Sequence, residues 1–419
     1  MKSLFSLLIA SATLWSACTT REISLTLQAG ETNRTDCVVS ADISALKPTA
    51  SSVITLYEWI DQGKTRQELP SQYAPEEGEP PTLYWILNGE TPAGSVRRFV
   101  AVIKELPPGT APDRKQAMDL VDTQKTLRLT KAGQAVLEYH YAHLDAPQGV
   151  DPAFGRSGFI HPAYSPAGHV LTQIQPQDHR HHFGIWNPWT RLIYEGQSYD
   201  LWNLGDKTGS VRARSIDQIF RGDVFCGYTA TLEHYILKPQ EEEQKVLNES
   251  WKVKAWNVPE GFLWDFESHL FPSTPQPVLL QAYRYAGFGY RARAEWTKDN
   301  CEMYTSEGKT RPHIDGTTAR WIYITGDTPG GRSGLLFMGH PNNYNAPEPL
   351  RIWDENANGG RGDAFINFAP TKNKDWELQP GGHYILKYRI LAYEGEMTPE
   401  QADRLWQDFA HSPKVIAQK

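Results

Sequence analysis

Short runs of strand-forming residues recur along almost the whole chain, and they constrain the fold more than any other feature. Runs such as TLRLTKAG, FLWDFESHLF and HYILKYRILAYEG alternate apolar and polar residues, with Gly, Pro, Asn or Ser between the runs. A period of two is the pattern of half-buried strands. The strongest helical pattern covers residues 398–412, where Thr398, Pro399 and Gln401 form a capping box ahead of an apolar stripe. The sequence therefore predicts an all-β fold with a C-terminal helix.

The order of these runs indicates two β units. We expect a signal peptide over 1–18, a small N-terminal β-sandwich domain over 19–105, a Pro-rich and charged linker over 106–119, and a main β domain over 120–397. The main domain holds roughly fifteen short runs, more than an immunoglobulin sandwich contains. It is therefore predicted to be a large antiparallel β-sandwich or supersandwich.

The N-terminus and the charge pattern bound where the protein works. Lys2, a short apolar stretch and small residues before Cys18 are typical of a signal peptide that ends in a lipobox. We therefore expect lipidation at Cys18 and a periplasmic or outer-membrane-anchored protein, with ordinary signal cleavage nearby as the alternative. A net charge of −7 without basic runs excludes the electrostatic footprint of a nucleic-acid binder.

The remaining cysteines and the missing motifs narrow the chemistry. Cys37, Cys226 and Cys301 form no CxxC pair and no zinc-finger spacing. A disulfide would be compatible with export, but three buried small hydrophobic side chains are the simpler interpretation. The sequence has no Walker loop, no nucleophile elbow and no HExxH motif, which excludes several common phosphotransfer and hydrolase mechanisms.

The densest polar motif is QPQDHRHHFGIW, residues 175–186. If it forms a strand, His179 and His181 share one face, about 6.6–7 Å apart along the strand. His182 and Asp178 then take the opposite face. Three uses remain open: acid–base catalysis or substrate binding by neutral imidazoles, a metal site on the HxH pair, or structural hydrogen bonding. A cupin-like metal site is disfavoured, because no glutamate follows within a few residues.

Polar residues elsewhere are candidates for the same site. The loop 154–173 places Tyr164 among Gly, Ser and Pro residues, where functional side chains concentrate, and Tyr164 is a candidate acid or base. In FLWDFESHLF, Asp265, Glu267 and His269 share one face of a strand, which favours a cleft along that face. The full set of candidate substrate-binding residues is Arg156, His161, Asp178, Trp186, Glu267, Arg291, His340 and Asn342.

The double motif RSGFIHPAYSPAGHVLTQ and DHRHHFGIW resembles a bacterial family of uncharacterised domains labelled "methane oxygenase PmoA-like". The resemblance continues through DFE, YAGFGYRA, the HPNN turn and PGGHYILKYRILAYEG, and it covers roughly residues 125–395. The label does not fit, because a particulate methane oxygenase subunit is an integral membrane protein and no spanning stretch follows the signal. The family implies a β-rich secreted protein, often a lipoprotein, from carbohydrate-degradation systems.

The HxHH motif beside a large β-sandwich is also similar to galactose-mutarotase-type supersandwiches, in which histidine and carboxylate groups move protons on sugars. Together these observations predict a secreted carbohydrate-active enzyme that acts on oligosaccharides by acid–base chemistry. His179, His181 and His182 are the candidate catalytic residues, with Tyr164 as a partner. Elimination by a lyase or dehydratase ranks above glycoside hydrolysis, because the motif favours histidine over paired carboxylates.

Two alternatives belong to other classes. A non-catalytic glycan-binding lipoprotein would carry Trp186, Trp189 and Trp202 along an open face. A metal-dependent enzyme would use the pair of His179 and His181 as ligands. We otherwise expect no cofactor, an oligosaccharide or another small molecule as the partner, membrane contact through the lipid anchor alone, and no nucleic acid. The oligomeric state stays open.

Overall fold

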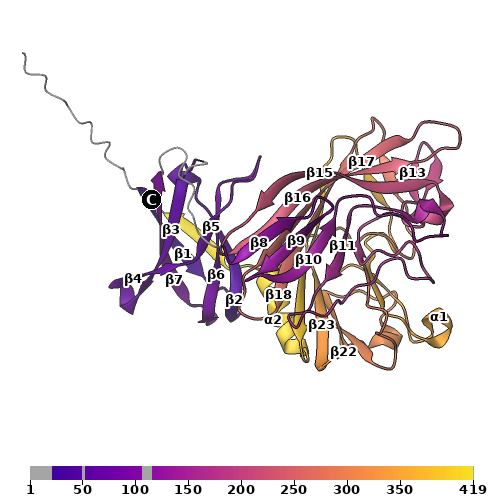
Figure 1. Cartoon of the computed structure of the whole chain (residues 1–419). Helices are drawn as coiled ribbons and strands as arrows, with labels where there is room; N and C mark the ends of the chain where they lie inside the picture. Colours follow the sequence, from indigo (N-terminus) through magenta and orange to yellow (C-terminus); the bar gives the residue numbers. More distant parts are fainter. Residues whose placement is uncertain (1–20, 50–51, 106–115, 419) are drawn as a thin grey trace, which may run out of the picture.

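The computed structural model describes residues 21–49, 52–105 and 116–418. The expected signal peptide with Cys18, and residues 106–115 of the expected linker, lie outside these described residues. Figure 1 shows two β-rich lobes, with the strands of the first hundred residues in one lobe. The sheets are antiparallel, so the all-β prediction is confirmed.

The first lobe is a small sandwich of two sheets around its own core. Its five-stranded sheet contains, in order, β28 (Lys414–Gln418), β1 (Arg21–Gln28), β7 (Val96–Glu105), β3 (Ser52–Ile60) and β4 (Thr65–Leu69). Its three-stranded sheet contains β2 (Arg34–Asp42), β6 (Thr82–Thr91) and β5 (Ser71–Tyr73). Alternate residues Ile23, Leu25 and Leu27 of β1 face the core, as a period of two requires. The sequence did not predict that the end of the chain returns as β28 and pairs with β1.

The second lobe contains two eight-stranded sheets that share one hydrophobic core. The sheet that we call the front sheet has the order β24 (Leu350–Ile352), β25 (Phe365–Phe368), β20 (Gly289–Arg291), β12 (Ile185–Trp186), β11 (Phe159–Ala163), β10 (Gln134–His140), β9 (Thr126–Lys131) and β8 (Met118–Asp122). The back sheet has the order β15 (Gly209–Phe220), β16 (Phe225–Ile236), β17 (Gln244–Trp256), β18 (Phe262–Pro272), β27 (Tyr384–Glu394), β23 (Gly331–Gly339), β22 (Trp321–Thr328) and β21 (Cys301–Thr305). Strand β8 begins inside the segment 106–119 that was expected to be a linker.

A smaller sheet and a few helical turns complete the second lobe. The four-stranded sheet has the order β14 (Gln197–Tyr199), β13 (Leu192–Tyr194), β19 (Val278–Leu280) and β26 (Trp376–Leu378). Within the described ranges, the α-helices are α1 (Ala357–Gly360) and α2 (Pro399–Ala410). The 3₁₀ turns of the same residues, in both lobes, are η1 (Ser44–Leu46), η2 (Asp61–Gly63), η3 (Pro152–Phe154), η4 (Leu204–Asp206) and η5 (Arg311–His313).

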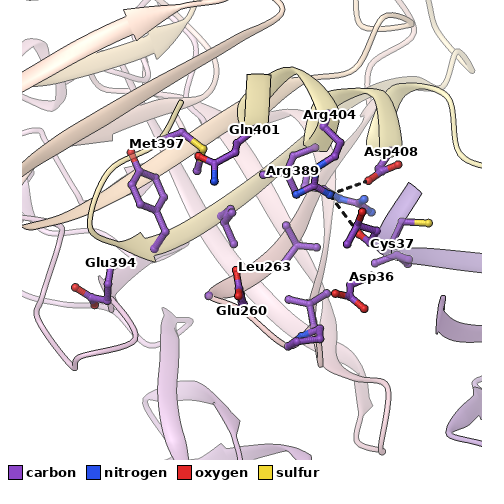
Figure 2. Close-up of a pocket in the computed structure, with 18 of the residues that line it drawn as sticks. Asp36, Cys37, Glu260, Leu263, Arg389, Glu394, Met397, Gln401, Arg404 and Asp408 are labelled. Atoms are coloured by element: carbon purple, nitrogen blue, oxygen red, sulfur yellow. Dashed lines mark hydrogen bonds and ion pairs between the residues drawn. The ribbon is translucent and has the colours of Figure 1, made fainter. Parts of the chain in front are cut away.

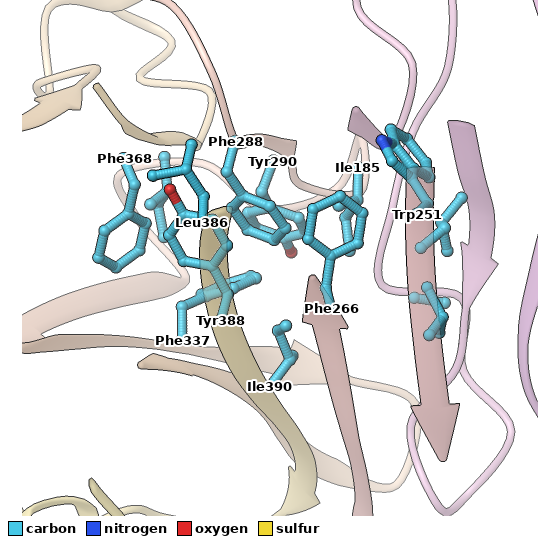
Figure 3. Packing of buried hydrophobic residues seen from close by; sticks show 14 of the residues in the cluster. Ile185, Trp251, Phe266, Phe288, Tyr290, Phe337, Phe368, Leu386, Tyr388 and Ile390 are labelled. Atoms are coloured by element: carbon cyan, nitrogen blue, oxygen red, sulfur yellow. The ribbon is translucent and has the colours of Figure 1, made fainter. Parts of the chain in front are cut away.

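Aromatic side chains fill much of the core between the front and back sheets, as Figure 3 shows. The ring of Phe288 stacks on that of Tyr388 with their centroids 4.5 Å apart, and Phe266 meets Trp251 edge-on at 4.8 Å. Because strand side chains alternate, each inward residue leaves its neighbour on the outer face of the sheet. The outer faces therefore carry the polar residues from which functional sites can be built.

The C-terminal helix is confirmed together with its cap. The backbone N–H of Gln401 donates to Thr398 Oγ1 at 3.2 Å, and the backbone N–H of Thr398 donates to Gln401 Oε1 at 2.9 Å. Ala402 and Trp406 are buried in a cluster that also contains Val38 of β2 and Trp321 of the back sheet. Helix α2 therefore packs where the two lobes meet.

Buried polar contacts also join the lobes. The Arg34 guanidinium lies 3.0 Å from the Asp408 carboxylate, and both side chains are 4% exposed. The Gln72 side-chain oxygen accepts hydrogen bonds from the backbone N–H groups of Val224 and Phe225. Removing such partners would leave buried polar groups unsatisfied, so these contacts fix how the lobes meet.

The cysteine interpretation is confirmed for the described residues. Cys37, Cys226 and Cys301 are free and buried. Burial raises the pKa of Cys37 and of Cys226 to about 12, so neither thiol is a reactive nucleophile at neutral pH. Among the described residues, no helix is both long enough and apolar enough to cross a bilayer.

Candidate functional site

The histidine motif lies in a closed loop between β11 and β12 of the front sheet, so it does not form the strand on which the expected alternation of its side chains depends. The backbone N–H of Gln175 donates to the carbonyl of His182 at 2.7 Å, which closes the loop. Gln175 has a φ of +45° and is followed by Pro176, two features that end an extended strand. Two further turn bonds, from His179 to Pro176 and from His182 to His179, wind the intervening residues.

This winding brings the three imidazoles together. The ring centroids of His179 and His181 are 5.5 Å apart, and His182 lies 4.9 Å from each. The separation of His182 from the other two rings, which a strand would impose, therefore does not occur. All three rings line one cavity of about 480 Å³, which we call the histidine cavity. Its other lining residues are Trp202, Asn203, Arg284, Tyr285, Arg351, Trp353, Asp354, Asn356, Ala357, Asn358 and Phe365.

Asp178 orients the ring of His179. Asp178 Oδ2 lies 2.8 Å from His179 Nδ1, 3.0 Å from Arg291 Nη1 and 2.9 Å from Asn358 Nδ2. Partial burial opposes ionisation of Asp178, but the hydrogen bond from His179 and the charge of Arg291 outweigh it and hold its pKa below the ordinary value. An ionised carboxylate can only accept hydrogen bonds, so Nδ1 of His179 carries the proton.

The consequence is a free basic nitrogen at the cavity. With the proton on Nδ1, a neutral His179 has its lone pair on Nε2, and no described residue hydrogen-bonds to that atom. The His179 side chain is 33% exposed, so a ligand in the cavity can reach it. An imidazole held by a carboxylate at one nitrogen and open at the other is the arrangement of a general base.

The other two histidines are neutral near pH 7. Burial, assisted by the neighbouring His179, lowers the pKa of His181 to about 4. Burial also lowers the pKa of His182 well below its ordinary value. His182 is 2% exposed, and its ring packs 5.0 Å from both Trp186 and Phe365. His181 therefore offers a neutral donor or acceptor, while His182 forms part of the wall.

The front sheet supplies the support beneath this loop. In β20, Tyr290 faces the core, so the next residue, Arg291, lies on the outer face, where it is 1% exposed. In β12, Ile185 and Trp186 divide between the two faces in the same way. The Arg291 guanidinium lies 4.7 Å from the ring of Trp353, a cation–π contact that adds to its ion pair with Asp178. The structure thus brings together Asp178, His179, His181, His182, Trp186 and Arg291 from the predicted set.

Three candidate residues of the segment 154–173, which precedes the histidine motif, do not line the histidine cavity. Arg156 is 3% exposed, donates from Nε to the Ser157 carbonyl, and lies over the ring of Phe183. His161 Nδ1 lies 2.8 Å from the Thr172 hydroxyl, and burial lowers the pKa of His161 to about 4. Tyr164 is close to Glu138, and burial raises its pKa. The geometry does not support Tyr164 as a direct partner of the histidines.

Glu267 and His340 line a different cavity, of about 370 Å³, between the first lobe and the outer face of the back sheet. We call it the junction cavity. Glu267 accepts from His269 Nε2 at 3.0 Å and lies 3.3 Å from Lys387 Nζ. Burial opposes its ionisation, but these partners lower the pKa of Glu267 to about 2. Asn342 is exposed, and its backbone N–H donates to His340 Nδ1.

A third cavity, of about 280 Å³, lies beneath α2 (Figure 2). Arg404 Nη1 of α2 donates to the Thr35 carbonyl of β2 at 3.4 Å, so a contact between the lobes borders this cavity. No residue predicted from the sequence as part of a site lines it.

Sequence reasoning missed the residues that complete the histidine cavity. Trp353, Asn358, Arg351 and Tyr285 come from segments that are distant in sequence from the motif. The segment ENANGGRGD, which contains α1, is rich in Asn and Gly, and Asn358 has a φ of +50°. That composition signals a shaped loop but not its position in space. Within the described residues, no group of three His, Cys, Asp or Glu side chains is arranged to hold a metal ion.

The comparisons with known proteins identify a family. A model described as a family of unknown function (DUF6807) matches residues 126–407, and the chain belongs to this family. No curated protein gives a significant match. The matched span contains the histidine loop and every lining residue of its cavity.

The chain also has a distant structural likeness to two glycosidases. One is an α-mannosidase from Enterococcus faecalis V583, with 8% identity, 95% of this chain and 46% of that chain covered, and a TM-score of 0.44. The other is a glycosyl hydrolase family 38 protein from Enterococcus faecalis, with 7% identity, 95% and 47% covered, and a TM-score of 0.41. This chain spans less than half the length of either, and likenesses of this size do not identify a function.

Proposed function

We propose that this member of a family of unknown function is a carbohydrate-active enzyme whose active site is the histidine cavity. His179 acts as the general base on a sugar ring, Asp178 fixes its tautomer, and His181 supplies a neutral hydrogen-bonding group. The observation that carries the proposal is the 2.8 Å contact between Asp178 and His179 Nδ1, which leaves Nε2 free at the cavity.

The walls of the cavity suit a sugar. Trp353 and Tyr285 offer ring faces, against which the apolar faces of pyranose rings pack. Asn203, Asn356 and Asn358 add amide groups that can donate to or accept from hydroxyl groups. A volume of about 480 Å³ lies within the ordinary range of small-ligand sites.

Elimination remains ahead of hydrolysis in this proposal. A classical glycosidase places two carboxyl groups across the scissile bond. Among the described residues that line the cavity, Asp354 is the one carboxylate, and Asp178 is held by its three partners beneath His179. A lyase or dehydratase with a histidine base fits this set better than paired-carboxylate hydrolysis does.

The glycan-binding alternative loses its main expected feature. Trp186 and Trp189 are fully buried and Trp202 is 1% exposed, so these three rings do not form an open platform. Export and lipidation at Cys18 stay part of the proposal, on the pattern of the N-terminal segment alone.

The test is incubation of the full exported chain with a broad oligosaccharide panel, followed by mass spectrometry. Wild-type protein is expected to convert at least one substrate, with a loss of 18 Da for dehydration, or with products whose masses sum to the substrate for chain cleavage by elimination. Products that sum to the substrate plus 18 Da would instead indicate hydrolysis. His179→Ala should lower kcat/KM by about 10²–10⁴-fold, while the exposed His313→Ala should match wild type. Binding across the panel without any mass change would overturn the enzyme proposal.

A further inference from the structure

One side of the histidine cavity carries positive charge that the surrounding protein does not balance. Arg284 lines the cavity, is exposed, and has no acidic partner among the described residues. Its guanidinium lies 5.3 Å from the ring of Tyr285 and 5.7 Å from that of Tyr283, which limits where it can point. A charged group held at a cavity wall without a counter-ion is a recognition element for an anionic ligand.

The neighbouring charges add to this imbalance. Arg351 also lines the cavity and lies 2.7 Å from Asp315, while Lys372 lies 3.3 Å from the same carboxylate. Lys372 further donates to the backbone carbonyl of Arg284, so the three cations are neighbours. Asp315 therefore forms ion pairs with two cations, Arg351 and Lys372. Asp354, the one carboxylate among the described lining residues, accepts from the backbone N–H of Asn356. At and just behind this wall, Arg284, Arg351 and Lys372 therefore outnumber Asp315 and Asp354.

The limited basicity of histidine also favours a substrate that carries an anionic group. An imidazole is too weak a base to remove a proton from an ordinary sugar carbon. A carboxyl group on that carbon makes the proton removable once a cation stabilises the charge that develops on the carboxylate oxygens. The cavity supplies both requirements, with His179 Nε2 as the base and Arg284 as the cation.

We infer that the histidine cavity takes a sugar that carries a ring carboxylate, a hexuronate, with Arg284 binding the carboxylate while His179 removes the adjacent proton. The inference rests on the proposed function and adds the substrate class. It commits to a carboxylate rather than a sulfate ester, because a sulfate ester does not acidify a ring C–H bond in this way.

The step balances without a co-reactant. His179 Nε2 takes the proton from the carbon that bears the carboxylate, and the C–H electron pair forms a C=C bond to the neighbouring carbon. The C–O bond from that neighbour to the next sugar breaks, and the departing oxygen receives the proton from His179. No water is consumed, so the masses of an unsaturated product and a shortened chain sum to the mass of the substrate.

The experiment compares hexuronate oligosaccharides with the same oligosaccharides after chemical reduction of their carboxylates. Wild-type protein should cleave the acidic form, with the ultraviolet absorbance of a conjugated unsaturated acid, and should neither cleave nor tightly bind the reduced form. Arg284→Gln should lower kcat/KM for the acidic form by about 10–100-fold, the effect of losing a hydrogen bond to a charged group. Arg284→Lys should recover part of this loss, and the exposed Arg98→Gln should match wild type.

The outcomes separate the two levels of the proposal. If the reduced form is turned over as well as the acidic form and the turnover needs His179, the substrate class is wrong and the proposed enzyme stands. If the acidic form binds but nothing is turned over, the proposed function fails. Calorimetry supplies a readout independent of turnover: equal binding of both forms, no binding of either, or tight binding of sulfated but not carboxylated oligosaccharides overturns the hexuronate inference.

Discussion

The histidine cavity and the junction cavity are both polar, but they differ in whether their charges are matched. In the junction cavity, Lys252, Lys254, Lys387 and Arg389 face Glu76, Glu79, Asp265 and Glu267, and each cation lies within ion-pair distance of a carboxylate. In the histidine cavity, Arg284 has no acidic partner among the described residues, and Nε2 of His179 is free.

The difference shows why density of charge is a poor guide to function. Paired charges between two lobes are already stabilised by each other and leave nothing for a ligand to satisfy. An unmatched cation and a free basic nitrogen at one cavity wall can gain an anionic partner and a proton from a ligand. The sequence alone makes Glu267 and Asp178 equal candidates for substrate binding. Their hydrogen-bond and ion-pair partners in the structure are what distinguish the two residues.

The largest effect that would test this contrast is on stability. Arg389 Nε and Nη2 donate to the two oxygens of Asp265 at 2.6 and 2.9 Å. Arg389→Met leaves the carboxylate of Asp265, whose side chain is 16% exposed, without its cation, so we expect the free energy of unfolding to fall by about 3 kcal/mol. Urea denaturation measures it, and turnover below the unfolding transition should stay within about twofold of wild type.

A double variant is the matched control for this prediction. Arg389→Met combined with Asp265→Leu removes both charges and should recover most of the lost stability, because no unpaired charge remains. A large loss of turnover in a folded Arg389→Met protein would show that the junction cavity takes part in the chemistry. That result would contradict the functional difference between the two cavities.

The next effect is on catalysis. Asp178→Asn keeps the size of the side chain but removes the charge that fixes the tautomer of His179 and pairs with Arg291. We expect kcat/KM to fall by roughly a hundredfold, about 2.7 kcal/mol of transition-state stabilisation. Glu267→Gln, the matched change in the junction cavity, should leave kcat/KM nearly unchanged. Equal losses in the two variants would contradict the assignment of the active site.

The smallest effect is on the pH dependence of stability, and its sign follows from the folded-state pKa values. The pKa of His181 is lowered from 6.5 to about 4 by burial, so between these values the unfolded chain binds more protons. The free energy of unfolding should therefore fall as the pH falls from about 6.5 to about 4, by roughly 1–2 kcal/mol for this half-buried group.

Glu267 of the junction cavity should affect the free energy of unfolding over a lower pH range than His181 does. The pKa of Glu267 is lowered from 4.5 to about 2, so its contribution is lost as the pH falls from about 4.5 toward 2. Urea denaturation across pH 7 to 4 should show a smaller decline for His181→Gln than for wild type, while Glu267→Gln should keep the wild-type decline above pH 4.5. An unchanged slope in His181→Gln would mean that His181 does not titrate as its burial requires.

Local sequence patterns were enough to predict part of the fold and of the polar surface. The alternation in FLWDFESHLF predicted β18 with Asp265, Glu267 and His269 on one face, and His269 indeed contacts Glu267 at 3.0 Å. The capping box predicted the start of α2. Both predictions succeeded because alternation and capping depend on residues within a few positions of one another.

The histidine loop shows where local reasoning failed. A strand through the motif would separate His182 from His179 and His181. Pro176 and the left-handed conformation of Gln175 turn the chain instead and gather the three rings. The pairing of β28 with β1 was missed for a related reason, since nothing near Lys414 in the sequence names a partner almost four hundred residues away.

Local sequence patterns were sufficient to predict the class of fold, the cap of the C-terminal helix and the burial of the three described cysteines, and they single out the histidine motif as a candidate site. The tertiary structure alone decided which charges are matched. Arg291 and Asn358 reach Asp178 across more than a hundred residues of chain, Arg284 lies at the same cavity without a counter-ion, and Glu267 finds Lys387 at the other one. A charge acts on its environment through distance and burial, and neither is a property of sequence position.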